Sequence, residues 1–201
     1  MKNEADISIA LSNDLKTLDL KEVDIVIPQD KSTEQRQLTE SEIQRLAKDT
    51  NLVSDFKNKR FEIDAKKHCD LFYRRNKTNF FKDRYWTFRE FQEISCENKS
   101  LLEIGCGVGN FVYPLLKENK KIFVYACDFS SDAVSLLKSN SDYDTDRCYG
   151  FVCDITKPDS LKDLMPADIK VDFVTLIFVF SAIHPDKMKT AVENIAHVSF
   201  K

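Results

Sequence analysis

The sequence lacks the marks of a membrane-spanning, secreted or zinc-binding protein. No apolar run approaches the ~18 residues that a membrane-spanning helix needs, so no membrane span is predicted. The first residues, Met1 to Asp6, are polar and acidic, so we expect neither a secretory signal nor an Arg-rich transit peptide. The six cysteines form no CxxC pair and no zinc-like spacing with histidine, so no metal site is predicted.

Two of these cysteines, Cys127 and Cys153, end apolar runs, which is typical of buried, reduced thiols. Reduced thiols indicate a cytoplasmic protein, with the nucleus as the alternative compartment. The sequence also lacks internal repeats and low-complexity tracts. At 201 residues the chain has room for one domain and an N-terminal extension.

Charge is present but unevenly distributed. The net charge is −3, yet residues 57–89 contain eleven Lys and Arg against four Asp and Glu, a local balance of +7. Such a basic block in an acidic protein indicates a polyanionic partner. Eight aromatic residues interleave with these cations and either stack unpaired bases or pack the block onto the rest of the domain: Phe61, Phe72, Tyr73, Phe80, Phe81, Tyr85, Trp86 and Phe88.

The arrangement of polar and apolar residues along the sequence divides the chain into three regions. Residues 1–37 are polar with weak periodicity and are predicted to be a mobile extension, in which residues 23–27 are a candidate short strand. Residues 38–98 are predicted to be a helical, basic and aromatic region that binds RNA. Residues 99–201 are predicted to be a partial Rossmann-like domain, because apolar runs and helical stretches alternate there.

Three helices are expected in the second region. Thr39 with Glu42 has the spacing of a capping box, so a helix is predicted to begin there. A second helix is predicted over residues 54–73. Thr87 with Glu90 has the same capping spacing, and the helix that follows is expected to turn three side chains inward, namely those of Phe88, Phe91 and Ile94.

The third region alternates between strands and helices. Apolar runs rich in β-branched and aromatic residues predict strands over 101–104, 122–127, 149–153 and 171–180. Helices are predicted over 111–118, over 131–139, after Pro158 and over 186–198, the last with one apolar face formed by Met188, Ala191, Val192, Ile195 and Ala196. Unbroken apolar strands separated by helices indicate an α/β fold with a parallel sheet covered on both faces.

A glycine loop follows the first predicted strand, with the sequence Glu103-Ile104-Gly105-Cys106-Gly107-Val108-Gly109-Asn110. Glycine is needed where a strand turns sharply into a helix and a ligand touches the backbone, as at Gly105 and Gly107. A dinucleotide site would have its third glycine at the position of Asn110. S-adenosylmethionine has no pyrophosphate, so the loop is compatible with that cofactor, with Glu103 near its cationic methionine part. A purely structural turn is the alternative.

Two acidic residues follow the next two strands. Asp128 ends the second strand, where an acid can bind both hydroxyls of a ribose, and Asp154 ends the third, where it can accept from an adenine amino group. The alternative for each is a cap on the following helix. Two such acids in succession after a glycine loop favour a nucleoside ligand.

The fourth apolar run leads into Ala182-Ile183-His184-Pro185, at the edge where open α/β sheets bind ligands. Ile177 and Phe178 are candidates to flank the adenine. No catalytic residue is assigned, and the candidates to face the substrate are Phe178, Ser181 and His184. His184 is equally compatible with a loop residue that makes a local hydrogen bond.

Several segments together resemble the eukaryotic tRNA 3-methylcytidine methyltransferases, over about residues 38–198. They are the glycine loop, Asp70-Leu71-Phe72-Tyr73, Asn79-Phe80-Phe81-Lys82-Asp83-Arg84 with Trp86, Tyr125-Ala126-Cys127-Asp128-Phe129-Ser130, and His184-Pro185-Asp186-Lys187-Met188. The motifs are specific as a set, whereas the glycine loop alone is not. Within the family the chain is most similar to the methyltransferase-like member that acts on serine tRNAs.

The resemblance implies S-adenosylmethionine-dependent methyl transfer to N3 of a cytosine in a tRNA anticodon loop, with serine tRNA as the substrate and seryl-tRNA synthetase as a candidate partner. It also implies the class I methyltransferase fold, in which the third, second, first and fourth strands lie in that order. The residues that contact the cofactor by this likeness are Tyr73, Gly105, Asp128, Asp154 and Ile177. The cations expected to bind RNA are Arg74, Arg75, Lys77, Lys82 and Arg84.

The chain departs from the family pattern in two places. Cys69 stands where the family usually has tryptophan, so one wall of the cofactor pocket is expected to be altered. After Val198 the family continues with a Leu-Lys-Pro-Gly type turn and further strands, so we expect a chain truncated at the C-terminus or ending in a divergent tail. Residues 171–180 would then be an exposed apolar edge strand that promotes association, and we expect weak cofactor binding and no methyl transfer.

Two other functions are compatible with the same sequence. One is a catalytically inactive form that binds RNA or a partner protein through residues 57–89. The other is a methyltransferase that acts on a small molecule or a protein, which the basic and aromatic block disfavours.

Overall fold

The computed structural model describes residues 37–48, 53–167 and 169–199. The predicted extension up to residue 36 and its candidate strand lie outside the described residues. The chain forms two units, Met1–Leu52 and Val53–Lys201. In the first, helix α2 (Glu40–Lys48) begins at the predicted capping box: the N–H of Thr39 donates to Oε2 of Glu42 at 2.9 Å, and the N–H of Glu42 donates to Oγ1 of Thr39 at 3.4 Å.

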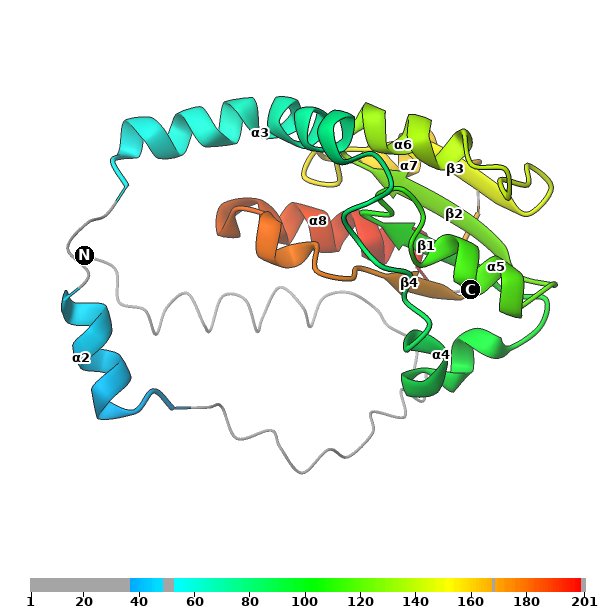
Figure 1. The fold of residues 1–201 in the computed structure, drawn as a ribbon, viewed down its shortest axis with the longest axis horizontal. Helices are drawn as coiled ribbons and strands as arrows, with labels where there is room; N and C mark the ends of the chain where they lie inside the picture. The colour runs from blue at the N-terminus through cyan, green and yellow to red at the C-terminus, as the bar shows by residue number, and fades with distance from the viewer. Residues whose placement is uncertain (1–36, 49–52, 168, 200–201) are drawn as a thin grey trace. The chain divides into compact units, whose positions relative to one another are not determined.

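The second unit is built on a parallel sheet of four strands, shown in Figure 1. The strands are β1 (Ser100–Ile104), β2 (Phe123–Asp128), β3 (Cys148–Val152) and β4 (Phe173–Thr175). They lie in the order β3-β2-β1-β4, and every neighbouring pair is parallel. The α/β fold class and the strand order of the class I methyltransferase fold are confirmed.

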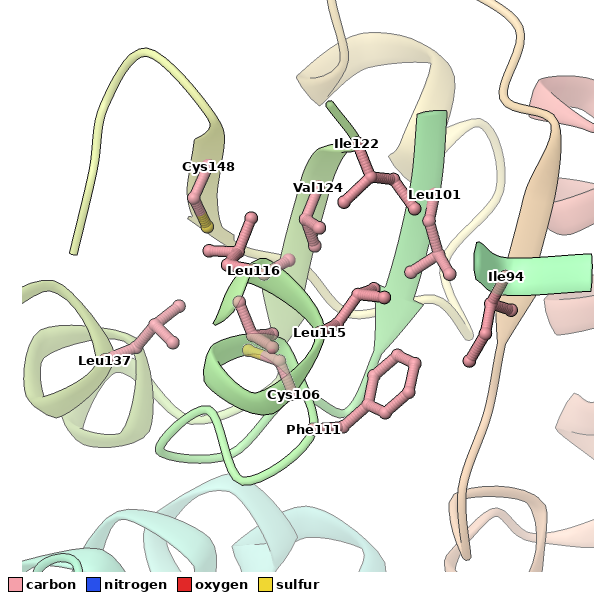
Figure 2. Packing of buried hydrophobic residues seen from close by; sticks show 12 residues of the cluster. Ile94, Leu101, Cys106, Phe111, Leu115, Leu116, Ile122, Val124, Leu137 and Cys148 are labelled. Atoms are coloured by element: carbon pink, nitrogen blue, oxygen red, sulfur yellow. The ribbon is translucent and has the colours of Figure 1, made fainter. Parts of the chain in front are cut away.

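Helices cover both faces of this sheet, because alternate residues of each strand are buried on opposite sides. Leu101 and Val124 pack with α5 (Val112–Glu118) and α6 (Ser131–Lys138) in one buried cluster, shown in Figure 2. Leu102 and Tyr125 pack with α7 (Ser160–Leu164) and α8 (Pro185–Val198) in a second cluster. This two-sided burial explains the near-continuous apolar runs of the strands.

Helix α3 (Asp55–Asn76) corresponds to the helix predicted over 54–73 and lies beside α6 (Figure 1). Two of its side chains attach it there. Oδ1 of Asp70 accepts from Oγ of Ser130 at 2.6 Å, and Nε of Arg74 lies 3.0 Å from Oδ2 of Asp132. An acid at the N-terminus of α6 also complements the dipole of that helix.

The strand predicted over 171–180 is wrong for most of its length. β4 ends at Thr175, which pairs with Glu103 near the end of β1, and Gly105 then turns β1 away, so β4 has no neighbour beyond that point. The rest of the run turns through Phe178 and a short 3₁₀ helix, η3 (Phe180–Ala182). Leu176, Val179 and Phe180 pack on the second cluster, Ile177 packs on the first, and Phe178 is exposed. The described residues therefore do not form the predicted apolar edge strand of ten residues.

Two smaller expectations are also wrong. Thr87 is not a helix cap, because its Oγ1 donates to the carbonyl of Arg84 at 2.7 Å, and the expected helix is only α4 (Thr87–Glu90) followed by the 3₁₀ helix η2 (Gln92–Ser95). Ile94 is buried as expected and Phe88 is partly buried, but Phe91 is exposed. On α8 the face toward the sheet includes Asn194, whose Nδ2 donates to two backbone carbonyls, whereas the expected Val192 and Ala196 are exposed.

The six cysteines are free thiols, and Cys127 and Cys153 are buried as predicted. Among the residues that the structure describes, no group of three or more His, Cys, Asp and Glu side chains is arranged to hold a metal ion. Within the same residues, no helix has both the length and the apolar character to cross a membrane.

Candidate active site

A cavity of about 450 Å³ opens at the carboxyl ends of the strands. It is bounded by α3, by the glycine loop, by the residues after β2 and β3, and by the turn after β4. This is the edge where open α/β sheets bind ligands. All eight residues predicted to bind the cofactor line it: Cys69, Tyr73, Glu103, Gly105, Gly107, Asp128, Asp154 and Ile177.

The glycine loop follows β1, and at Gly105 and Gly107 a side chain would collide with the two segments that approach the loop. Gly105 has a φ of 72°, and a Cβ there would collide with the side chain of Val179, which packs over the loop. Gly107 has a φ of 54°, and a Cβ there would lie 2.9 Å from the hydroxyl of Tyr73. The loop therefore has no side chains at the two positions where α3 and the turn after β4 approach its backbone.

Asp128 is 8% exposed and is held by the backbone on both oxygens. Its Oδ2 accepts from the N–H of Gly107 at 2.8 Å, and its Oδ1 accepts from the N–H of Ser130 at 2.8 Å. Burial raises the pKa of this carboxyl, and the two backbone donors partly offset the rise. Asp128 is not the cap of the following helix, because Oγ of Ser130 accepts from the N–H of Ala133 and caps α6.

Asp154 lies two residues beyond β3 and also lines the cavity. Its Oδ1 accepts from the N–H of Thr156 at 3.1 Å and from Oγ1 of Thr156 at 2.6 Å. The side chain therefore stabilises a local turn, and it does not cap α7, whose N-cap is Asp159. Its Oδ2 has only a long contact with Lys157, at 3.9 Å.

Glu103, near the end of β1, is 3% exposed, and its Oε2 has no hydrogen-bond partner among the described residues. Burial raises the pKa of this carboxyl well above its ordinary value, the positive charge of Arg84 opposes the rise, and Asp128 adds to it. A buried polar atom without a partner is rare and calls for a ligand or an ion in the functional state. The cavity beside Glu103 is where such a group can bind.

Arg84 was predicted to bind RNA, but the structure places it in the cavity wall, partly buried. Asn110 determines where it lies: Nδ2 of Asn110 donates to the carbonyl of Phe81 at 3.2 Å and to Oδ1 of Asp83 at 3.1 Å. In return the N–H of Arg84 donates to the carbonyl of Asn110 at 2.8 Å. The sequence does not predict this position of Arg84, and the asparagine in place of a third glycine is the one signal for it.

The other candidate RNA-binding cations lie outside the cavity. Arg74 forms the ion pair with Asp132, so part of its role is to attach α3 to α6. Arg75, Lys77 and Lys82 are exposed, and none of them forms an ion pair with another described residue. Three of the five predicted cations are therefore available to a polyanion.

Some aromatic residues of the basic block (residues 57–89) pack onto the domain, and others are exposed and could stack on bases. Phe72, Tyr73 and Phe88 are partly buried, as packing requires. Phe72 also contacts Phe80 and Phe81, with ring centroids 4.9 and 5.9 Å apart. Five rings are exposed, namely those of Phe61, Phe80, Phe81, Tyr85 and Trp86.

Two of the three candidates to face the substrate line the cavity. Phe178 is 78% exposed and has a φ of 63°, a conformation that is uncommon outside glycine and is often found at functional sites. His184 also lines the cavity, but its Nδ1 accepts from the N–H of Asp186 at 3.3 Å, which is the local hydrogen bond of the alternative interpretation. Ser181 does not line it, and its Oγ donates to the carbonyl of Phe178 at 3.3 Å.

Comparisons with known proteins agree with this geometry. A family model described as "Methyltransferase domain" matches residues 102–198. The chain is 52% identical over 176 residues to the tRNA N(3)-cytidine methyltransferase METTL6 of Homo sapiens, which covers 85% of this chain and 61% of that protein. It is 43% identical over 150 residues to the tRNA N(3)-methylcytidine methyltransferase trm141 of Schizosaccharomyces pombe, covering 73% of this chain and 60% of that one. Over these spans the chain is homologous to the tRNA N(3)-cytidine methyltransferases.

The resemblance predicted from the motifs is thus confirmed, and the chain spans about three fifths of the length of the curated relatives that it matches. Among solved structures, a TehB-like SAM-dependent methyltransferase from Corynebacterium glutamicum superposes with a TM-score of 0.49 at 19% identity, covering 66% of this chain and 67% of that one.

Proposed function

We propose that this chain is an S-adenosylmethionine-dependent methyltransferase that forms 3-methylcytidine in tRNA. The observation that supports this most directly is the cavity: the glycine loop, Glu103, Asp128 and Asp154 meet in one pocket at the strand ends, in a chain 52% identical over 176 residues to METTL6. The volume of about 450 Å³ is within the range of small-molecule sites.

The residues of the cavity fit this cofactor. Asp128 is a buried acceptor next to the bare backbone of Gly107, as a ribose with two hydroxyls requires. Oε2 of Glu103 lacks a partner and is suited to an ammonium group. Asp154 has a second oxygen toward which an adenine amino group can donate, and Ile177 supplies an apolar wall.

When bound, S-adenosylmethionine supplies an electrophilic methyl group to the cavity. Cytosine N3 has a free lone pair when the base is neutral, so the chain needs no general base and its residues act by positioning an in-line attack and by excluding water. Phe178 is exposed at the cavity wall and presents an aromatic ring on which a cytosine can stack. An anticodon-loop base is accessible to such a site because it is unpaired or easily extruded.

The RNA surface that we propose consists of Arg75, Lys77 and Lys82 with the exposed rings of Phe80 and Trp86. Cations neutralise phosphates while aromatic faces stack unpaired bases, so this composition suits a single-stranded loop. On this basis we propose that residues 38–98 form the RNA-binding region and residues 99–201 the methyltransferase domain.

The finer assignments rest on the resemblance. We propose serine tRNA as the substrate and seryl-tRNA synthetase as a partner that presents it. The six free thiols suit a reducing compartment, so we place the protein in the cytoplasm, with the nucleus as the second compartment.

The test combines binding with transfer. Calorimetry measures S-adenosylhomocysteine binding, a gel shift measures tRNA binding, and tritiated S-adenosylmethionine measures label incorporated into total tRNA. We expect both ligands to bind and label to enter the tRNA. If both bind and no label is incorporated, the chain is the non-catalytic RNA-binding form that the sequence left open, and the proposed activity is wrong.

A further inference from the structure

Cys127 and Cys153 are two thiols that the proposed reaction does not use. Cys127 lies in β2 and Cys153 directly follows β3, and both side chains belong to the same buried cluster on one face of the sheet. Cys127 is fully buried, whereas Cys153, although buried, lines the cavity. Cys153 is therefore the thiol of the two that a small reagent in the cavity can contact.

The two thiols meet between neighbouring chain segments. In the register of β2 with β3, Cys127 is paired with Phe151, so Cys153 lies two residues further along and its side chain is on the same face. The N–H of Cys153 donates to the carbonyl of Asp128 at 3.0 Å, which holds the segment after β3 against the end of β2. In this position the thiol of Cys127 donates a hydrogen bond to the sulfur of Cys153.

This contact gives the two thiols different reactivity. The hydrogen bond from Cys127 lowers the pKa of the Cys153 thiol, and burial opposes the decrease. The same hydrogen bond, together with burial, raises the pKa of the Cys127 thiol well above its ordinary value. A thiol with a larger thiolate fraction, in contact with a second thiol, has the arrangement of an attacking cysteine and its resolving cysteine.

We propose that Cys127 and Cys153 form a redox-active dithiol, a modification site at which hydrogen peroxide closes a disulfide that lowers cofactor affinity. The thiolate of Cys153 attacks one oxygen of the peroxide, so that an S–O bond forms and the O–O bond breaks. Hydroxide leaves, takes up the proton that Cys153 had released, and leaves Cys153 as a sulfenic acid. Cys127 then loses its proton and attacks this sulfur, the S–S bond forms, the S–O bond breaks, and the proton and hydroxide leave as water. Two thiols are oxidised while one peroxide is reduced to two waters.

The disulfide would act on the cofactor through the two acids that follow the cysteines. Asp128 directly follows Cys127, Asp154 directly follows Cys153, and both acids line the cavity. Bridged cysteines have Cα atoms within about 7 Å, whereas diagonal partners in regular parallel strands are about 8 Å apart. Closing the disulfide therefore draws the segment after β3 toward β2 and shifts both acids from the positions in which backbone N–H groups hold them. The effect on affinity rests on the proposed function, whereas formation of the disulfide does not.

The first measurement needs no cofactor. The wild-type chain is treated with hydrogen peroxide, the remaining thiols are alkylated, and disulfide-linked peptides are mapped by mass spectrometry. We expect a peptide that joins Cys127 to Cys153 and that disappears with dithiothreitol. Cys127→Ala lacks the resolving thiol, so it should form no such peptide and should instead accumulate a sulfenic acid at Cys153 that dimedone traps. Cys96→Ser is the control, because Cys96 is exposed and outside the cavity, and it should form the same peptide as the wild type.

The second measurement is calorimetry with S-adenosylhomocysteine on reduced, oxidised and re-reduced protein. Oxidation should lower the affinity of the wild type and of Cys96→Ser about tenfold or more, and dithiothreitol should restore it. Binding and oxidation are linked, so the cofactor must oppose the disulfide as strongly as the disulfide opposes the cofactor. In a glutathione redox buffer, saturating S-adenosylhomocysteine should therefore shift the wild-type equilibrium toward the dithiol by the same factor.

Several outcomes contradict the proposal. If the peptide that joins Cys127 to Cys153 is absent, or if Cys153 is joined to Cys69 instead, the two thiols are not a redox pair. If the disulfide forms and the affinity for S-adenosylhomocysteine is unchanged, it does not act on the cofactor. If oxidised Cys127→Ala loses as much affinity as the wild type, or if Cys96→Ser loses the response, oxidation acts elsewhere. If the reduced wild type does not bind S-adenosylhomocysteine, the proposed function and the effect on affinity are both overturned, while the mapped disulfide still supports the dithiol.

Discussion

Replacement of Asp128 by asparagine is predicted to remove most of the cofactor affinity. Asp128 is 8% exposed and faces the cavity, where a charged carboxylate can accept from two ribose hydroxyls. A hydrogen bond to a charged group contributes about 1.5–3 kcal/mol, and asparagine keeps one neutral acceptor oxygen. We therefore expect a loss of about 2–3 kcal/mol, which is about 30- to 150-fold in affinity for S-adenosylhomocysteine.

The same substitution also affects the fold, and the two effects must be separated. Asp128 accepts from the N–H groups of Gly107 and Ser130, each at 2.8 Å, so asparagine removes one of these hydrogen bonds, because its NH2 group cannot accept. Asp172→Asn is the matched control. Asp172 likewise accepts from a backbone N–H, that of Ser100 at 2.8 Å, but it is outside the cavity.

Calorimetry with S-adenosylhomocysteine and thermal unfolding, done on both variants, separate the effects. Both should unfold at lower temperature than the wild type, and only Asp128→Asn should lose affinity. Unchanged affinity in Asp128→Asn refutes the ribose assignment. A matching loss of affinity in Asp172→Asn shows instead that affinity follows the stability of the sheet.

Two further predictions concern the surface and the start of β4. Reversing the charges of Arg75, Lys77 and Lys82 to glutamate should weaken tRNA binding in a gel shift and flatten its salt dependence, with cofactor affinity unchanged; tRNA binding that survives at moderate salt contradicts the RNA surface. The backbone N–H of Ser100, followed by Lys99, lowers the pKa of Asp172 to about 2, from an ordinary value of about 3.8. Its contribution to stability is present above pH 4 and is lost as the pH falls toward 2, so acid unfolding of Asp172→Asn should depend less on pH across that window.

The site could be predicted from the sequence because its parts are local. A strand that ends in a glycine loop, and acids that end the next two strands, identify residues whose positions follow from the sheet itself. Gly105, Asp128 and Asp154 lie at the carboxyl ends of parallel strands, and those ends meet at one edge. Parallel strands alone were enough to predict that these three residues lie close together.

The fourth apolar run could not be interpreted in the same way. Its composition favours a strand through Phe180, but a strand exists only while a neighbour pairs with it. β1 turns away at Gly105, so the run leaves the sheet after Thr175, and Val179 packs over the loop instead. The end of β4 is decided by the partner strand and not by its own residues.

The position of Arg84 could not be predicted from the sequence for a different reason. It belongs to a block in which most cations are exposed, and no periodic pattern indicates which of them turns inward. Its direction depends on Asn110, a residue 26 positions later whose side chain holds the segment before Arg84. A tertiary contact of this kind has no signal in the sequence beyond the unusual asparagine itself.

Identification of the product tests whether the cavity methylates cytidine N3 in tRNA. Serine tRNA is incubated with the chain and S-adenosylmethionine, digested to nucleosides and separated by chromatography with mass detection. We expect 3-methylcytidine as the product, and none with Asp128→Asn or with a tRNA whose target cytidine is replaced by uridine. A different methylated nucleoside, or none when S-adenosylhomocysteine and tRNA both bind, would contradict it.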